Sequence, residues 1–322
     1  MSAALAPLPL RFRCPSCRAS LAANAAELAC AACGRRYPVL DGIPSFCEAD
    51  PFYEQYISHH VPYHLSPQGL KGFVLRWLPY WSWREWRFWR RSVPRGGWLL
   101  DLGCARGREI FAERAGACVG VDTARTALAD CARHYRLAVQ SGLVPLPFED
   151  ASFDCVVTSH VIGHIPAQEK DGVVAEIARV LKPGGRSVHV IETDSRHPLL
   201  LFAKQWPDLY RRWFIEPDGH VGLELPSAVL ARFARHGLRT VACWKMEAGP
   251  FHPRQWLKHF DNEYATHSTE VAAAVRRSRR LTGNPALLAM AEVGLGVYHY
   301  TLGQWRRPLD HANFLAVVFE KA

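Results

Sequence analysis

Short apolar runs alternate with stretches of helical periodicity through the central part of the chain. The apolar runs are four to seven residues long and nearly continuous, as expected for strands buried on both faces of a sheet. Strands are predicted at 97–102, 117–121, 137–140, 153–159 and 186–192, with helices between them at 106–115, 123–134 and 167–181. Farther on, the pattern predicts a helix at 226–236 and strands at 238–246 and 313–320. This alternation indicates an α/β fold with a largely parallel sheet.

The first predicted strand ends in a turn of small residues. Gly103, Ala105 and Gly107 follow Asp101, and bare turns of this kind let backbone N–H groups approach a ligand closely. The second strand ends in Asp122, a carboxylate placed to accept hydrogen bonds from ribose hydroxyls. An alternative role for Asp122 is to cap the helix that follows it. The spacing of the turn is G-x-A-x-G and not the G-x-G-x-x-G of dinucleotide-binding proteins.

Two further segments occur in order with this turn. Residues 146–154 (Leu-Pro-Phe-Glu-Asp-Ala-Ser-Phe-Asp) precede the fourth strand, and residues 181–185 (Leu-Lys-Pro-Gly-Gly) lead into the fifth. With them, residues 96–246 resemble class I S-adenosylmethionine (SAM) methyltransferases of the type 11 kind. The resemblance implies a Rossmann-like seven-stranded sheet with helices on both faces, and SAM as cofactor. Another nucleotide-binding α/β domain is the alternative.

The resemblance also implies which residues hold SAM. The turn would receive the methionyl carboxylate, Asp122 the ribose, and the backbone near residue 143 the adenine. Ala105 replaces the family's usual middle glycine and fits only with a negative φ, and Gly142 stands where the family often has an acid. The expected cofactor-binding residues are Asp101, Gly103, Ala105, Gly107, Asp122, Thr123, Ser141, Gly142, Leu143 and Ser159.

Two histidines follow the fourth strand, where the methyl group would point. His164 is the first candidate for a general base if the acceptor is a hydroxyl, and His160 is the second. His164 has an alternative role, which is to orient its loop. The D/N/S-P-P-Y/F motif of enzymes that methylate exocyclic amines of adenine or cytosine is absent from the sequence, which disfavours those reactions.

Four cysteines near the N-terminus have the spacing of a metal site. Cys14 and Cys17, then Cys30 and Cys33, form two C-x-x-C pairs that would present four thiolates to a structural Zn²⁺. Residues 37–44 resemble the end of the Trm112-like zinc-ribbon family, so we expect a zinc ribbon over residues 1–48. The alternative is a ribbon without metal. We expect the metal and not a core to supply its folding energy. Nearby arginines would offset the thiolate charge: Arg11, Arg13, Arg18, Arg35 and Arg36.

Residues 49–95 form an aromatic and basic connector. Ser66 before Pro67 predicts the start of one helix, and a capping box over residues 82–85 predicts a second helix that Pro94 ends. Aromatic residues surround the second helix, which indicates that it is covered on more than one side. Three roles compete for the connector: a lid over the SAM site, an RNA-binding surface, or a peripheral contact with a membrane.

The third predicted domain, residues 96–322, contains a long insertion at about 247–311. Helices are expected there at 255–265, 269–281 and 285–300. The last of these contains Glu292, glycines and His299, which makes it a poor membrane span. With residues 193–225, the insertion is expected to build the acceptor pocket.

The 322-residue chain has a formal charge of +9, which suggests an acidic partner or simple solubility. Its N-terminus lacks the pattern of a signal peptide, and its cysteines fall in a metal pattern or in predicted core elements; both point to the cytoplasm. We therefore expect a SAM-dependent methyltransferase acting on a small or medium, partly apolar organic acceptor at O, N or C. The alternatives are an rRNA or tRNA base methyltransferase and a non-catalytic binding subunit with the same fold.

Overall fold

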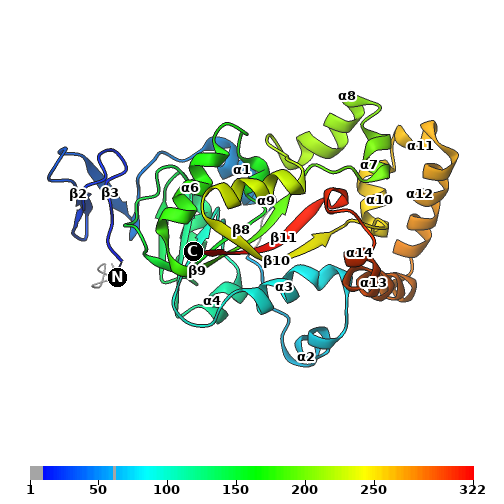
Figure 1. Cartoon of the computed structure of the whole chain (residues 1–322), viewed down its shortest axis with the longest axis horizontal. Coiled ribbons are helices and arrows are strands. Elements are labelled where there is room, and N and C mark those ends of the chain that lie inside the picture. The colour runs from blue at the N-terminus through cyan, green and yellow to red at the C-terminus, as the bar shows by residue number, and fades with distance from the viewer. Residues whose placement is uncertain (1–9, 61–62) are drawn as a thin grey trace.

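A computed structural model describes residues 10–60 and 63–322, with the side chains of residues 57–60 excepted. The described chain contains a small sheet at one end, a large sheet in the middle and a group of helices at the other end (Figure 1). The strands of the small sheet are β1 (Ala22–Ala23), β2 (Glu27–Ala29), β3 (Arg36–Leu40) and β4 (Ile43–Pro44). Those of the large sheet are β5 (Trp98–Leu102), β6 (Ala117–Asp122), β7 (Leu137–Gln140), β8 (Phe153–Ser159), β9 (Leu181–Glu192), β10 (Leu238–Met246) and β11 (Phe314–Lys321).

The large sheet has the order β10-β11-β9-β8-β5-β6-β7. Strand β11 is antiparallel to the other six strands, which all run in one direction. The prediction of a seven-stranded Rossmann-like sheet is therefore confirmed. β9 begins at residue 181, five residues earlier than expected. Strands β10 and β11 pair along their whole length although the insertion separates them in the sequence.

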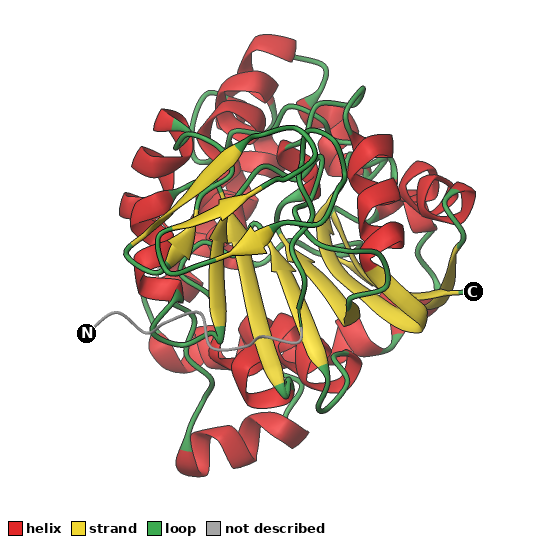
Figure 2. Ribbon diagram, turned by 90° about the vertical axis from the view of Figure 1, so that its left-hand side faces the viewer, coloured by secondary structure: helices red, strands yellow, loops and turns green. Residues whose placement is uncertain are grey.

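Alternating side chains of each central strand enter two separate cores. In β5, Leu100 and Leu102 pack against the helices at residues 170–180 and 226–235. Leu99 packs on the opposite face, against the helices at residues 84–92, 109–114 and 125–131. Figure 2 shows the strands with helices around them. The helices that cover the sheet are α3 (Arg84–Ser92), α4 (Glu109–Arg114), α5 (Arg125–Cys131), α6 (Lys170–Val180) and α9 (Pro226–Arg235).

The N-terminal ribbon shares a core with the large sheet. Phe12 stacks on Phe148 with ring centroids 5.8 Å apart, and the fully buried Leu28 belongs to the same core. Packing therefore contributes to the stability of the ribbon, contrary to the expectation that metal alone would supply it. The arginines also differ from the expectation, because Arg18 pairs with Glu176 of α6 at 3.1 Å. Arg13 likewise pairs with Asp150 at 2.7 Å, and Arg36 with Glu27 at 2.7 Å.

The connector is helical, but neither predicted helix start is correct. Its elements are α1 (Pro51–His60), α2 (Gly69–Trp77), the short 3-10 helix η1 (Trp81–Trp83) and α3. Gln68, and not Ser66, is the N-cap of α2. The expected capping box at α3 is absent because Ser82 and Glu85 each bind a distant partner: Ser82 bonds Glu292, and Glu85 bonds His160. Trp86, Phe88 and Trp89 are buried, which confirms that this helix is covered on more than one side.

The insertion between β10 and β11 packs with the segment after β9 around a second, aromatic core. Helix α13 lies against the connector, because Gly296 meets the backbone of Pro79. The helices and short turns of this part are α7 (Pro198–Ala203), α8 (Pro207–Tyr210), η3 (Arg211–Ile215), η4 (Glu216–Asp218), α10 (Pro253–Phe260), α11 (Tyr264–His267), α12 (Thr269–Thr282), α13 (Pro285–Tyr300), α14 (Leu302–Trp305) and η5 (Leu309–His311). One further turn, η2 (Ile162–His164), follows β8. Within the described residues, no helix combines the length and apolarity needed to cross a bilayer.

Candidate active site

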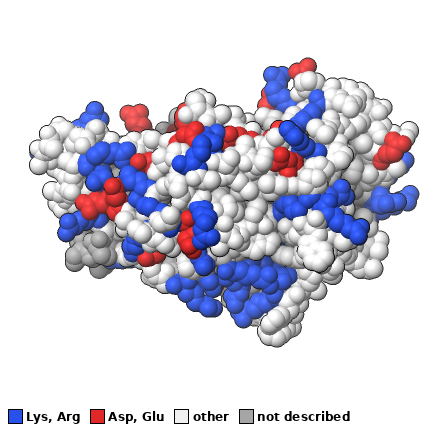
Figure 3. Space-filling model, in the orientation of Figure 1, with Lys and Arg blue, Asp and Glu red and all other residues white. Residues whose placement is uncertain are grey.

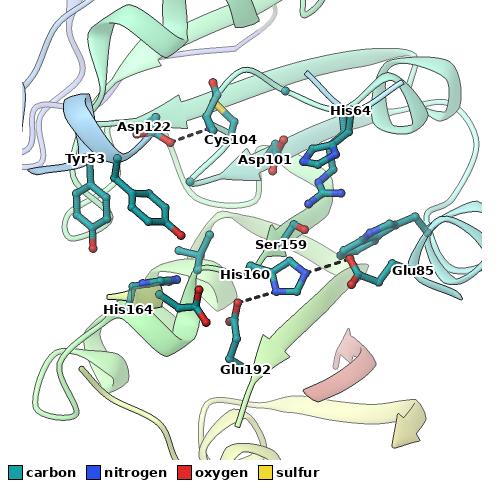
Figure 4. Close-up of a pocket in the computed structure, with 18 of the residues that line it drawn as sticks. Tyr53, His64, Glu85, Asp101, Cys104, Asp122, Ser159, His160, His164 and Glu192 are labelled. Atoms are coloured by element: carbon teal, nitrogen blue, oxygen red, sulfur yellow. Dashed lines mark hydrogen bonds and ion pairs between the residues drawn. The ribbon is translucent and has the colours of Figure 1, made fainter. Parts of the chain in front are cut away.

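A cavity of about 740 Å³ lies at the carboxyl ends of β5, β6 and β8. Ligands of open α/β sheets bind at this edge, because the loops after parallel strands converge there. The large sheet forms one wall, the connector another, and the segments after β8 and β9 close the far side. Figure 4 shows side chains from all of these elements pointing toward one space. Every residue expected to bind the cofactor lines it: Asp101, Gly103, Ala105, Gly107, Asp122, Thr123, Ser141, Gly142, Leu143 and Ser159.

The turn after β5 is held in an unusual backbone conformation. Gly103 has φ +66° and Gly107 has φ +89°, and a side chain at Gly103 would collide with Val161. Ala105 has φ +46°, so the condition of a negative φ at this position is wrong. Its N–H donates to the carboxylate of Asp122 at 2.8 Å, and this bond holds the alanine in the left-handed region.

Asp122 fixes two turns at once. One carboxylate oxygen accepts from the Ala105 N–H, and the other accepts from the Ala124 N–H at 2.9 Å, at the start of α5. Asp122 thus holds the turn before α5, whose N-cap Ala124 has no side-chain cap, so the helix-capping alternative is wrong; the same carboxylate lines the cavity. Each carboxylate oxygen has a second lone pair, so the ribose-binding role stays available. Burial raises the pKa of Asp122 above its ordinary value.

Asp101 lies deeper, at the base of the same turn. The Tyr135 hydroxyl donates to its carboxylate at 2.8 Å, and the Arg108 backbone N–H donates to the Tyr135 oxygen at 2.8 Å. Burial raises the pKa of Asp101 to about 7, although the Tyr135 hydrogen bond opposes this effect. A neighbouring cation would favour the ionised form.

The ribbon contacts the part of the structure that places residues 141–143 in the cavity wall. The Phe46 N–H donates to the Gln140 carbonyl at 2.8 Å, and the Ser45 hydroxyl donates to the Gln140 side chain at 2.7 Å. The Gln140 amide in turn donates to the Thr123 carbonyl at 3.2 Å. The chain after the ribbon therefore supports the end of β7, from which Ser141 and Gly142 enter the cavity wall.

His160 is clamped between two carboxylates. Its Nδ1 lies 2.6 Å from Glu192, at the end of β9, and its Nε2 lies 3.0 Å from Glu85 of α3 (Figure 4). Burial opposes a charge on this imidazole, but the two carboxylates outweigh it and raise the pKa of His160 to about 10. A charged imidazole with both nitrogens engaged has no lone pair to accept a proton. The arrangement therefore contradicts a base role for His160, and instead ties the connector to the sheet.

His164 has a different environment. Its Nδ1 lies 3.1 Å from the Gly219 carbonyl, which can only accept, so the neutral ring carries its proton on Nδ1 and a lone pair on Nε2. His220 lies beside it, with ring centroids 5.0 Å apart. His164, His220 and Glu192 each place a ligand-type atom within 4.8 Å of the others. These three side chains form the polar end of the cavity.

Sequence reasoning missed several residues of this cavity. Trp83, Trp86 and Glu85 enter it from the connector. Tyr53 and Tyr56 of α1 also line it, and the sequence had left a pocket position or a solvated loop open for them. A lid role for the connector was one of the predicted alternatives, but no local pattern distinguished these positions from exposed ones. Glu192 carried a usable signal, because it is an acid at the end of a buried strand. Asp218 and Lys258 carried none.

The cavity is rich in polar atoms without partners. Within the described part of the chain, ten buried side-chain polar atoms lack a hydrogen bond, and six of them belong to residues that line this cavity. Such atoms are rare in folded proteins unless a ligand or water satisfies them. The cavity thus fits a ligand with several polar groups, as SAM is. The six residues are Ser66, Trp86, Trp89, Ser159, Glu192 and His220.

The four ribbon cysteines converge away from this cavity. The Cys14 and Cys33 sulfurs lie 3.7 Å apart, and the Cys17 and Cys30 sulfurs lie 3.4 Å apart. Tetrahedral Zn²⁺ with bonds of about 2.3 Å needs sulfurs about 3.8 Å apart, so this arrangement fits the ion closely. All ten cysteines of the chain are free thiols.

Comparison with known proteins finds similarity in the central part of the chain. Residues 100–189 match the family model described as a methyltransferase domain. A probable SAM-dependent methyltransferase of Mycolicibacterium smegmatis is 35% identical over 123 residues, which are 36% of this chain and 46% of the relative. The human probable tRNA methyltransferase 9B is 27% identical over 205 residues, 60% of this chain and 42% of the relative. The chain thus spans about half the length of these relatives.

A solved structure shares the fold. Geranyl diphosphate C-methyltransferase from Streptomyces coelicolor, solved with Mg²⁺, geranyl diphosphate and S-adenosyl-L-homocysteine, superposes with a TM-score of 0.52. The match has 12% sequence identity and covers 85% of this chain and all of the other. At that identity the likeness concerns the fold alone.

The clamp at His160 generates a pH prediction. Because the folded-state pKa of about 10 lies above the unfolded value of about 6.5, the clamp stabilises the fold fully below about pH 6.5. This contribution is lost as the pH rises through about 10. Glu85→Gln removes one carboxylate and should lower the pKa of His160, which NMR titration of the imidazole measures. Glu113→Gln, an exposed acid on α4, is the control. An unchanged His160 titration in Glu85→Gln would contradict the clamp.

Proposed function

We propose that the class I methyltransferase domain of this chain transfers a methyl group from SAM to a small or medium, partly apolar organic acceptor. The observation that carries the proposal is the single cavity, which runs from the Asp122 turn past Ser159 to the histidines after β8. One end offers backbone turns and a carboxylate, which suit an amino acid and a ribose. The part beyond Ser159 is walled by Trp83, Trp86 and Phe314, with the polar group of His164, Glu192 and His220 beside them, which suits a partly apolar acceptor.

SAM, when bound, supplies an electrophilic methyl group on its sulfonium. The chain's residues then align the two reactants and manage the acceptor's proton. Gly103 and Gly107 keep side chains out of the amino-acid end, and the Ala105 turn holds Asp122 beside the ribose position. Ser159, whose hydroxyl is buried without a partner, lies where the strand end meets the cofactor.

His164 is the residue we assign to the acceptor. Its Nδ1 proton is committed to the Gly219 carbonyl, which leaves the Nε2 lone pair to accept a proton from a hydroxyl acceptor. We assign His160 a positioning role instead. Its charge holds Glu85 and Glu192 together and so keeps the connector closed over the cavity. Water exclusion by this lid protects the reaction.

A second candidate function is methylation of a tRNA base. The match to tRNA methyltransferase 9B favours it, because the aligned sequence extends over 60% of this chain, against 36% for the Mycolicibacterium smegmatis relative. The basic charge of the chain also agrees with it. The apolar lining of the acceptor end and its cover of connector residues favour the small molecule over a base extruded from RNA.

Cofactor binding gives the first test. Asp122→Asn keeps the shape of the side chain but removes its charge, so it should weaken SAM binding about 10- to 100-fold in calorimetry. Asp208→Asn, at an acid whose side chain is 91% exposed, is the matched control and should bind like the parent chain. Equal affinities for the two variants would refute the assignment of Asp122.

The acceptor class gives the second test. Cell extract incubated with the protein and methyl-labelled SAM should place the label in an organic-soluble small molecule, identified by mass spectrometry. With that acceptor, His164→Ala should lower kcat about 10²- to 10⁴-fold at unchanged SAM affinity. Label found only in RNA would exclude the first function and support the second. No transferred label, with SAM still bound, would point to the non-catalytic alternative.

We also infer that the ribbon holds one structural Zn²⁺ through Cys14, Cys17, Cys30 and Cys33, with no open position for catalysis. Thiol ligands and the absence of disulfides suit a reducing compartment such as the cytoplasm. Cys17→Ser should abolish the zinc content measured by elemental mass spectrometry and lower Tm, because metal binding is coupled to folding. Cys47→Ser, at a half-buried cysteine outside the cluster, should change neither. Full zinc content in Cys17→Ser would count against this site.

A further inference from the structure

The apolar stripe of helix α2 faces solvent, whereas the apolar stripe of a helix in a folded domain normally packs against the core. Leu70, Phe73, Val74 and Trp77 follow the i, i+3, i+4, i+7 spacing of one helix face, and their exposed fractions are 78%, 59%, 42% and 76%. The buried positions of this helix are Gly72 and Leu75, on the opposite face. Leu75 packs into the core that also contains Trp89 and so holds α2 to the body, while Gly72 leaves room for the Pro67 carbonyl just before the helix. The large apolar side chains therefore point outward.

The apolar stripe is bordered by cations. Lys71 and Arg76 flank it on α2 itself, and Arg91 and Arg95 are exposed at the end of α3 and just beyond it. Partial burial and the nearby charges of Arg76 and Arg95 lower the pKa of Arg90, which shows that these guanidinium groups lie close together. In the described part of the chain, no carboxylate forms an ion pair with Arg76, Arg90, Arg91 or Arg95. Glu113 is the acidic group that faces Arg90.

The space-filling view shows the same arrangement. A broad blue surface occupies the lower edge of the molecule, and a white protrusion lies beside it where Figure 1 places α2 (Figure 3). Helices α13 and α14 follow along the lower right of Figure 1 and add exposed Met290 and Trp305. An apolar ridge next to unpaired arginines is what an anionic lipid surface accommodates: the ridge enters the interface, and the arginines meet the phosphates.

We propose that α2 and the arginines beside it (Arg76, Arg90, Arg91 and Arg95) form a docking surface for an anionic phospholipid bilayer. Leu70, Phe73, Val74 and Trp77 insert at headgroup depth, with the aromatic rings in the interface and the helix axis parallel to the membrane. Leucine and valine side chains contribute nothing to phosphate recognition in nucleic acids, so the stripe favours lipid over RNA. The density of arginines disfavours a second copy of the chain, because two such surfaces would repel each other.

The docking surface adjoins the proposed acceptor site. Leu65 and Ser66, a few residues before α2, line the cavity, and Leu65 is 67% exposed. The same segment thus connects the bilayer surface to the lid. This connection depends on the proposed function, whereas the docking itself does not.

Vesicle sedimentation tests the proposal with the full-length protein. The protein should pellet with vesicles of phosphatidylglycerol and phosphatidylcholine but not with phosphatidylcholine alone, and high salt should weaken the binding by screening. Arg91→Gln combined with Arg95→Gln should weaken it about 30-fold, at about 5-fold for each arginine. Phe73→Ala combined with Trp77→Ala should weaken it at least about tenfold, and should remove the blue shift of tryptophan fluorescence on vesicles.

Matched controls separate this surface from total charge and apolarity. Arg276→Gln with Arg277→Gln removes the same charge from an exposed face of α12, and Leu201→Ala with Val221→Ala removes exposed apolar groups elsewhere. Both pairs should bind vesicles like the parent chain. All altered residues are exposed, so Tm and SAM affinity should stay unchanged, which makes failure of docking distinguishable from failure of the proposed function.

Three results would overturn the proposal. The first is a parent chain that does not pellet with anionic vesicles, and the second is a control pair that weakens binding as much as the α2 pair. The third is a different occupant of the surface. Light scattering that shows a dimer lost in the Phe73→Ala, Trp77→Ala variant would assign the stripe to self-association. RNA binding abolished by that variant, with no vesicle binding, would assign it to nucleic acid.

Discussion

The hydrogen bonds of one carboxylate hold the cavity together. Asp122 ends β6 and accepts N–H groups from the turn after β5 and from the start of α5. Its position follows from the parallel pairing of β5 and β6, which brings both strand ends to the same edge. These bonds stabilise the left-handed backbone conformation of Ala105, which is otherwise unfavourable for an alanine, and so keep the small-residue turn open to the cavity. This end of the cavity is therefore shaped by the protein's own hydrogen bonds.

The ribbon and the connector, which lie outside the large sheet, complete or support the walls of the cavity. The ribbon packs Phe12 on Phe148 and supports the end of β7 through Ser45 and Gln140, next to the cavity wall at Ser141 and Gly142. The connector closes the opposite side, where the charged His160 joins Glu85 to Glu192. Each segment is attached both by buried apolar contacts and by hydrogen bonds or ion pairs. The apolar contacts stabilise the attachment, and the directional polar bonds fix the position of the segment relative to the sheet.

Helix α2 shows that one segment can serve two surfaces. Its inner face packs Leu75 into the core beside α3, and its large outer face stays exposed. The residues just before it enter the cavity wall. The exposed apolar residues of α2 and the arginines beside it would, as a docking surface, bring the cavity near a lipid bilayer without a membrane-spanning helix.

The sequence by itself determined the central sheet, because strand and helix periodicities and the glycine turn are local signals. It also predicted the convergence of the residues from Asp101 to Ser159, since the ends of parallel strands must meet. The tertiary structure decided the rest. It gave Ser82 and Glu85 distant partners, Glu292 and His160, in place of a capping box, because a buried ion pair or hydrogen bond outweighs a weak local cap. It put Ala105 at positive φ and made His160 an imidazolium, because both outcomes depend on carboxylates that lie 17 to 75 residues away in sequence. Which side of α2 faces solvent was likewise decided by the packing of Leu75 into the core, a contact that no periodicity reveals.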